Sequence, residues 1–199
     1  MIIGIAGKSQ SGKDTTAMMI NFLSQYPNAS FHTYWESDFP FDWDDDTIVH
    51  YADLLKDVSE TMLSLPRFTL QSQKGKSSTI EWLDGMTCRE FLQKLGTAVR
   101  NEVHPDFWVR ALINRRIKNK EKLTIIPDVR FPNEAQVIKD NGGFLIRMER
   151  PGAGAGEHIS ETALDDYKGW DIVIDNVGTL EDLYKQVKFL LDNNDIPIK

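Results

Sequence analysis

The amino-acid sequence predicts an α/β protein with a parallel sheet of about five strands and helices on both faces. Short apolar runs of strand composition alternate along the chain with longer segments of helical periodicity. A glycine-framed loop follows the first apolar run directly and leads into a helical segment. Strands that alternate with helices form parallel sheets, because each helix returns the chain to the edge where the next strand begins. The sequence contains no internal repeat.

Each element follows from a local pattern. The expected strands are the apolar runs at residues 1–6, 47–52, 123–127, 144–148 and 171–175. Helices are expected from residue 13 to about 26, and over residues 53–65, 86–102, 107–119, 132–141 and 179 onward. Pro27, Pro66 and Pro105 mark helix ends, since proline cannot continue a helix. Thr179 and Asp182 have the spacing of a capping box at the start of the last helix.

Two segments are expected to lack regular structure. Residues 30–47 mix aromatic with acidic side chains, which favours an irregular insertion that caps the sheet edge, with a binding loop as the alternative. Residues 68–78 are rich in Ser, Gln and Lys and are expected to form a mobile loop. The chain is interpreted as one domain, residues 1–199, with a helical part around residues 54–120.

Composition narrows the class of protein. With 199 residues, of which 41% are hydrophobic and 27% charged, the chain has the composition of a soluble globular domain. A formal net charge of -7 argues against a nucleic-acid-binding surface but permits a local basic pocket for a small anion. Cys88 is the only cysteine, so no intrachain disulfide can form. Because no run of membrane-spanning length and no basic leader is present, we expect no membrane association and a cytoplasmic location.

The strongest motif lies at residues 7–16, which read Gly-Lys-Ser-Gln-Ser-Gly-Lys-Asp-Thr-Thr. Gly7 and Gly12 frame a loop between the first strand and the first helix, and Lys13 begins that helix. This arrangement is a P-loop. In it, backbone N–H groups, the positive end of the helix dipole and a lysine ammonium together surround a phosphate.

Residue 14 departs from the usual motif, in which Ser or Thr offers a hydroxyl to Mg²⁺. The Asp14 carboxylate could serve the metal through water, or Thr15 could supply the hydroxyl, and the sequence leaves both open. Asp128 follows the strand at residues 123–127, where a P-loop enzyme places the acid that holds the magnesium shell. Arg130, two residues later, can reach the same crevice.

Further polar residues are candidates for a second ligand. Asp53 and Lys56 follow the strand at residues 47–52, so we expect them to face the ligand crevice, although Asp53 could instead be a helix N-cap. The helix at residues 86–102 has an apolar stripe that consists of Cys88, Leu92, Leu95 and Val99. Its adjoining polar stripe suits a phosphorylated ligand, unless it is a solvated face, and consists of Arg89, Gln93, Gly96, Thr97 and Arg100.

Together these motifs resemble the bacteriophage-type deoxynucleoside monophosphate kinases, within the P-loop nucleoside-monophosphate kinase group. The resemblance covers nearly the whole chain except residues 30–47, and the Asp after the P-loop lysine is a trait of the family. The matching motifs are Gly-Lys-Asp-Thr-Thr at 12–16, Lys56-Asp57, the segment 89–97 followed by Trp108, Pro127-Asp128-Val129-Arg130, Arg150-Pro151-Gly152, His158-Ile159-x-Glu161 and Asp175-Asn176-x-Gly178-x-Leu180-Glu181.

The resemblance implies transfer of the γ-phosphoryl group of ATP to the phosphate of a deoxynucleoside monophosphate (dNMP), with Mg²⁺ as cofactor. The implied ATP-binding residues are Gly7, Ser11, Gly12, Lys13, Asp14, Thr15 and Asn176. Substrate binding is implied for Asp53, Lys56, Arg89, Gln93, Thr97, Arg100, Trp108, Arg130 and Arg150. Lys13, Asp128 and Arg130 are the implied catalytic residues. The implied metal ligands, partly through water, are Asp14, Thr15 and Asp128.

Two other functions stay open at this point. One is a P-loop kinase with another phosphorylated acceptor, of the dephospho-coenzyme A or phosphomevalonate type. The other is a P-loop protein that binds nucleotide without turnover. The sequence does not decide which bases are accepted, whether ribonucleotides are excluded, or the oligomeric state, with which a homodimer is compatible. A phage-encoded chain would act in the host cytoplasm.

Overall fold

A computed structural model describes residues 1–37, 47–119, 123–154 and 162–198 of the chain. These residues divide into two compact units. The first, which we call the sheet unit, consists of residues 1–49 and 116–199, and the second, the helical unit, consists of residues 50–115. The two ends of the helical unit therefore both connect to the sheet unit. Whether the chain functions as a single domain stays a prediction.

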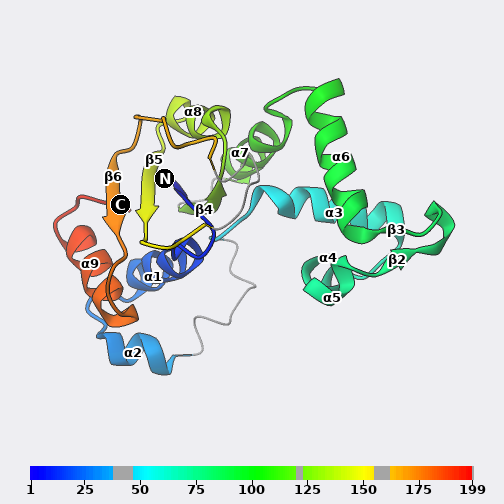
Figure 1. The fold of residues 1–199 in the computed structure, drawn as a ribbon. Coiled ribbons are helices and arrows are strands. Elements are labelled where there is room, and N and C mark those ends of the chain that lie inside the picture. Colours follow the sequence, from blue (N-terminus) through cyan, green and yellow to red (C-terminus); the bar gives the residue numbers. More distant parts are fainter. Residues whose placement is uncertain (38–46, 120–122, 155–161, 199) are drawn as a thin grey trace. The chain divides into compact units, whose positions relative to one another are not determined.

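The sheet unit is built on four parallel strands in the order β4-β1-β5-β6 (Figure 1). Their bounds are Ile2–Gly7 for β1, Thr124–Val129 for β4, Phe144–Glu149 for β5 and Ile172–Asp175 for β6. The first strand of the chain thus lies inside the sheet, between β4 and β5. This confirms the predicted α/β fold and four of the five predicted strands.

Residues 47–52, the remaining predicted strand, contribute only a bridge between Ile48 and Ile125. Val49 donates its N–H to the carbonyl of Ile125 at 2.9 Å, and the chain then enters helix α3, Tyr51–Leu63. The helix begins early because a carboxylate oxygen of Asp53 accepts the backbone N–H of His50 at 2.7 Å. That bond caps the helix and ends the extended segment before Tyr51.

Helices cover both faces of the sheet. Ile3 and Ile5 of β1 are fully buried in the core that contains α1, Lys13–Gln25, and α9, Leu180–Asp192. Successive strand residues point to opposite faces, so Gly4 points the other way. A Cβ at Gly4 would lie 2.7 Å from Ile138 of α8, Pro132–Asp140. Glycine therefore allows α8 to pack closely on the second face.

Part of the segment at residues 30–47 is helical, where the sequence favoured an irregular insertion. Helix α2, Phe31–Glu36, is capped by Ser30, whose hydroxyl accepts the N–H of Thr33 at 3.1 Å. The helix forms because Tyr34 is 3% exposed and packs its ring 5.3 Å from that of Tyr184. Burial and the neighbouring Tyr184 raise the pKa of Tyr34 to about 12, so this phenol stays neutral in the core. Residues 38–46 lie outside the described residues.

The helical unit has a small core of its own. Its elements are α3, α4 at Arg67–Gln71, α5 at Gln73–Lys76, β2 at Thr79–Ile80, a 3-10 turn at Glu81–Leu83, β3 at Met86–Thr87, α6 at Cys88–Glu102 and the first part of α7 at Phe107–Asn119. Strands β2 and β3 are antiparallel. The core consists of Leu63, Leu70, Ile80 and Cys88.

The prediction of a mobile loop at residues 68–78 was wrong, because the segment forms α4 and α5. Leu70 is fully buried and anchors α4 in the small core. Ser72 caps α5, since its hydroxyl accepts the N–H of Gly75 at 3.0 Å. In α6, Cys88 of the expected apolar stripe is fully buried, whereas Leu92, Leu95 and Val99 are half-buried. None of the helices among the described residues is both long and apolar enough to cross a membrane.

The capping box at α9 generates a test of the fold. The Thr179 hydroxyl accepts the N–H of Asp182 at 3.2 Å, while the Asp182 carboxylate accepts the N–H of Thr179 at 2.9 Å. We expect Thr179→Ala to lower the free energy of unfolding by about 1 kcal/mol, because a helix-terminal donor loses its partner. Denaturant unfolding measures the change. Thr179→Ser keeps the hydroxyl and should remain close to the parent; equal losses for both variants would contradict this role.

Candidate functional site

The loop between β1 and α1 requires glycine at both ends. Gly12 precedes α1 with φ 98°, in the left-handed region, and a Cβ there would lie 2.6 Å from the side-chain nitrogen of Asn176. A Cβ at Gly7 would lie 2.6 Å from the carbonyl oxygen of Met148. Since no larger residue fits, the loop backbone can approach a ligand closely. The predicted order of strand, glycine loop and helix is confirmed.

Ser11 has a polar group that the described structure leaves unsatisfied. Its side chain is fully buried, and its hydroxyl has no hydrogen-bond partner among the described residues. An unpaired buried polar group costs about 1–3 kcal/mol, which makes the Ser11 hydroxyl a candidate for a bond to a ligand. The carbonyl of Ser11 accepts a bond of 3.0 Å from the amide of Asn176, which fixes the loop against the end of β6.

A cavity of about 350 Å³ opens beside this loop, at the carboxyl ends of β5 and β6. Ligand pockets begin at about this size. The residues that line the cavity are Lys8, Ser11, Arg147, Met148, Glu149, Arg150, Pro151, Ala153, Asp175 and Val177. Arg150, expected from the resemblance to bind substrate, therefore lies beside the P-loop.

The four side chains that follow Gly12 differ in environment. Lys13 donates its ammonium N–H to the carbonyl of Lys8 at 2.8 Å, across the loop. Asp14 is exposed in the first turn of α1 and Thr15 is half-buried. Thr16 is fully buried, and its hydroxyl contacts the sulfur of Met148 at 3.5 Å. Asp14 and Thr15 are thus the more accessible oxygen donors, and their metal roles stay predictions.

Asp128 lies where the pairing of β4 with β1 becomes irregular. Gly4 pairs with Ile126 but Ala6 pairs with Val129, so Pro127 and Asp128 together oppose Ile5. This two-against-one pairing is a β-bulge, and Pro127 fits there because proline has no N–H to donate to the neighbouring strand. A β-bulge changes the direction of the side chains that it carries.

Asp128 is half-buried at this bulge and Arg130 is exposed just beyond the strand. The buried carboxylate of Glu134 accepts the N–H groups of Arg130 at 2.8 Å and Phe131 at 3.2 Å. The backbone after the strand is therefore held firmly. Sequence analysis did not single out Glu134, although it occupies the third position of a helix that begins with proline.

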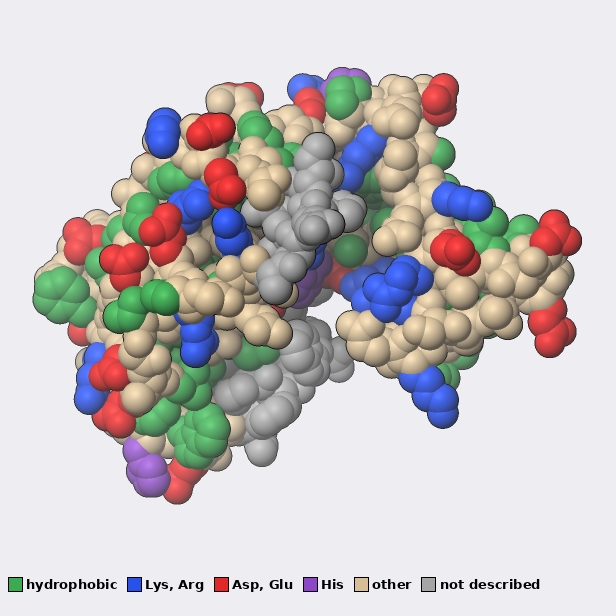
Figure 2. Space-filling view, viewed as in Figure 1, with side chains coloured by type: hydrophobic (Ala, Val, Ile, Leu, Met, Phe, Trp, Pro, Cys, Tyr) green, Lys and Arg blue, Asp and Glu red, His purple; other side chains and the backbone are tan. Residues whose placement is uncertain are grey.

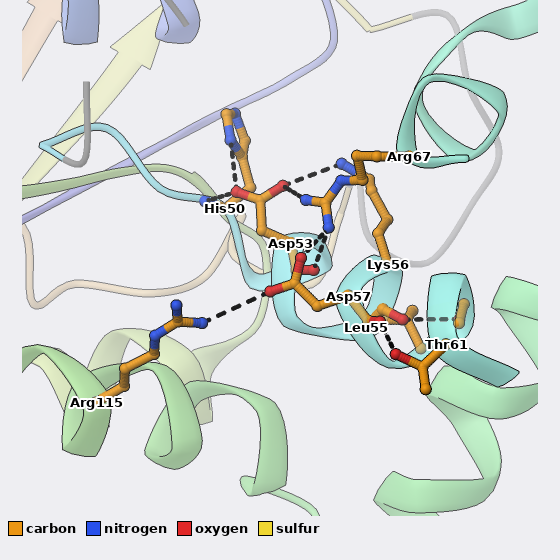
Figure 3. Close-up of polar contacts among 9 residues, drawn as sticks. His50, Asp53, Leu55, Lys56, Asp57, Thr61, Arg67 and Arg115 are labelled. Atoms are coloured by element: carbon orange, nitrogen blue, oxygen red, sulfur yellow. Dashed lines mark hydrogen bonds and ion pairs between the residues drawn. The ribbon is translucent and has the colours of Figure 1, made fainter. Parts of the chain in front are cut away.

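In the helical unit, Asp53 is the centre of a charged network (Figure 3). One carboxylate oxygen contacts His50, through its backbone N–H at 2.7 Å and its imidazole at 3.4 Å. The other contacts Lys56 and Arg67, both at 3.1 Å. Burial alone would raise the pKa of Asp53, but the hydrogen bonds from His50 and the charges of Lys56 and His50 outweigh it. The pKa therefore lies far below its ordinary value.

Lys56 also belongs to a group of cations. Burial lowers the pKa of Lys76, and the positive charges of Lys56 and Arg89 lower it further, so the three side chains lie within electrostatic range. Gln73 accepts a bond of 2.7 Å from the Arg89 guanidinium and fixes it against α5. Figure 2 shows Lys and Arg side chains gathered on this unit near α4 and α5. We call Lys56, Lys76 and Arg89 the cation cluster.

The structure brings only part of the predicted polar stripe to this cluster. Gln93 and Thr97 are exposed on α6 and Arg100 is half-buried. Gly96 instead serves packing, because a Cβ there would lie 3.2 Å from Leu55 of α3. Trp108 is 6% exposed and donates its indole N–H to the carbonyl of Gly96 at 3.1 Å.

Sequence reasoning missed Lys76 and Arg67. Both lie in or beside the segment that was expected to be a mobile loop, and neither has a periodic relation to the residues it faces.

The motif at residues 158–161 lies outside the described residues. Among the described residues, no group of three or more His, Cys, Asp or Glu side chains could hold a metal ion.

Comparisons with known proteins agree with the sequence motifs. A family model for deoxynucleotide monophosphate kinase matches residues 45–187. A protein of Acanthamoeba polyphaga mimivirus, provisionally named a deoxynucleotide monophosphate kinase, is 29% identical over 211 residues, which cover 97% of each chain. The deoxynucleotide monophosphate kinase of Enterobacteria phage T4 is 30% identical over 110 residues, or 53% of this chain and 45% of the phage protein.

The lowered pKa of Asp53 predicts a pH dependence of stability. Its contribution is present above the pKa of the unfolded state, about 4, and is lost as pH falls toward the lower folded-state pKa. We therefore expect Asp53→Asn to be less stable than the parent at pH 7. The difference between the two should shrink as pH is lowered from about 5 to 2.

Denaturant unfolding at several pH values measures this difference. Asp166→Asn, at an exposed position, makes the same change of charge and serves as the control. A stability difference for Asp53→Asn that does not vary with pH would contradict the assigned role of the ionised carboxylate.

Proposed function

Because this chain belongs to the deoxynucleotide monophosphate kinase family, we propose that it transfers the γ-phosphoryl group of ATP to the phosphate of a dNMP. The products are ADP and the deoxynucleoside diphosphate. The observation that carries the proposal is the P-loop with the unsatisfied, buried hydroxyl of Ser11 beside a cavity. That arrangement suits a nucleotide whose phosphates occupy the loop.

On the donor side, the residues supply complementary charge and hydrogen bonds. The N–H groups at the start of α1 and the Lys13 ammonium stabilise the triphosphate, and the Ser11 hydroxyl bonds to the nucleotide. The cavity receives the nucleoside, with Arg150 among the residues that line it. Asn176 acts through the loop, because its amide fixes the Ser11 carbonyl.

On the acceptor side, the cation cluster in the helical unit supports binding of the dNMP phosphate. Three cations close together repel one another, as the lowered pKa of Lys76 indicates. A phosphate dianion removes that repulsion, and the Arg89 guanidinium can bind it with two parallel hydrogen bonds. Gln93, Thr97 and Arg100 on the same helix remain candidates for contacts to the base and sugar.

The chemical step needs little beyond positioning and charge. An oxygen of the dNMP phosphate, already ionised, forms a bond to the γ-phosphorus while the bond from that phosphorus to the oxygen of ADP breaks. No general base is required. Lys13 and Arg130 neutralise the charge that spreads over the transferred group.

The oxygen donors near the P-loop fit Mg²⁺, which typically combines one or two carboxylates with substrate phosphates and water. Asp128 and Asp14, with Thr15 as the alternative hydroxyl, would hold the ion. When bound, it neutralises charge on the β- and γ-phosphates. Asp128 is suited to this role because the bulge at Pro127 sets its direction at the end of β4.

An ADP-release assay with ATP and each of the four dNMPs tests the proposal, with the matching ribonucleotides as a comparison. ADP formation that depends on a dNMP is the expected result. ADP formation only with other phosphorylated acceptors, or none with any acceptor, would overturn it and leave one of the other P-loop functions.

Lys13 provides the sharpest test of the donor site. We expect Lys13→Ala to lower kcat on the order of a hundredfold or more, because a fixed charge on the transferred group is lost. Steady-state kinetics with a saturating dNMP measures the effect. Lys185→Ala removes an exposed lysine from α9 and should leave kcat within about twofold. A folded Lys13→Ala enzyme with parental kcat is incompatible with the P-loop role.

The cation cluster provides the test of the acceptor site. Removal of one charged hydrogen bond costs about 1.5–3 kcal/mol, so Lys76→Met should raise the KM for dNMP about tenfold or more. The KM for ATP should change little. Lys74→Met, on the same short helix but exposed, is the matched control. Equal KM values for dNMP in the two variants would place the acceptor site elsewhere.

A further inference from the structure

Arg67 joins two carboxylates of α3. One guanidinium nitrogen contacts Asp53 Oδ1 at 3.1 Å, and the other contacts Asp57 Oδ1 and the backbone carbonyl of Asp53 (Figure 3). The Arg67 side chain is 25% exposed, so water screens these contacts only in part. Arg67 therefore binds both carboxylates from α4, a different helix.

Lys56 shares the same carboxylate oxygen. Its ammonium lies 3.1 Å from Asp53 Oδ1, and its side chain is 15% exposed. Within the part of the chain that the structure describes, this oxygen is the only hydrogen-bond acceptor of the Lys56 ammonium. An ammonium has three N–H donors, so two remain for an anion. Lys56 thus pairs with Asp53 and is at the same time one of the three cations of the cation cluster.

The balance of charge in this network depends on Arg67. Asp53 and Asp57 are opposed by Lys56, Arg67 and the more exposed Arg115, which lies 3.6 Å from Asp57. One positive charge is left in excess. Without Arg67 the network would be neutral, and Asp53 would bind Lys56 without a competitor.

We propose that Arg67 is a positioning residue for the acceptor phosphate. By binding Asp53 and Asp57, it leaves the charge and the N–H donors of Lys56 for the phosphate of the dNMP. The inference rests on the proposed function, since it takes the cation cluster as the acceptor site. Arg67 does not touch the substrate and acts through Lys56.

The competing explanation is that Arg67 only holds α4 against α3 and has no effect through Lys56. In that case the loss of Arg67 would lower stability and would change the KM for dNMP by the same factor whether or not Lys56 is present. A double-mutant cycle separates the two explanations, because only residues that act through one another show non-additive effects.

The cycle compares the KM for dNMP, at saturating ATP, of the parent, Arg67→Gln, Lys56→Met and the double variant. We expect each single variant to raise this KM about tenfold, with kcat changed less. The double variant should equal Lys56→Met within about twofold. Arg67→Lys restores the charge but cannot bridge both carboxylates, so partial recovery is expected. Arg110→Gln, which removes an exposed arginine paired with Asp106 in the same unit, should leave the KM unchanged.

Each result has one consequence. The positioning role would be overturned if the double variant shows the product of the two single effects on the KM for dNMP. It would also be overturned if Arg67→Gln leaves this KM unchanged. Neither result would contradict the proposed kinase activity. A parent enzyme that phosphorylates no dNMP would overturn the proposed function, and the inference would fall with it. If circular dichroism shows that Arg67→Gln is unfolded, the same cycle with Arg67→Lys decides by the same criterion.

Discussion

The position of β1 inside the parallel sheet is the constraint on which the rest of the sheet unit depends. The strand pairs with β4 on one side and β5 on the other, and all strands point the same way. Their carboxyl ends therefore meet at one edge. That edge carries the P-loop after β1, Asp128 at the end of β4, Arg150 after β5 and Asn176 after β6. Residues far apart in sequence thus share a site because strand direction is uniform.

The sheet unit could largely be predicted from the sequence. Its strands are continuous apolar runs, its helices have amphipathic spacing, and proline or a capping box marks their ends. The P-loop was predictable because the loop requires glycine at two fixed positions. Gly12 adopts φ 98°, and neighbouring atoms leave no room for a Cβ at either Gly7 or Gly12. Asn176 was found through family resemblance, since no local pattern shows that its amide reaches Ser11.

The helical unit was less predictable, because tertiary contacts decide its short elements. Helices α4 and α5 have five and four residues, too few for periodicity to show. They form because Leu70 is buried and Ser72 caps the following turn. The ion pair of Arg67 with Asp53 and the electrostatic effect of Lys56 on Lys76 follow from that packing. Residues 47–52 read as a strand, since the cap between His50 and Asp53 has no strong sequence signal.

The helical unit is also one uninterrupted stretch of chain, which enters at His50 and leaves at Arg115. Both of these residues contact carboxylates of α3 that Arg67 joins, so the unit's own network holds its two ends. A single gene segment therefore encodes every residue of the cation cluster, together with the charges that balance it. Replacing this one stretch of chain would exchange the cation cluster and its balancing charges together, while the glycine loop and the strands of the sheet unit stay unchanged.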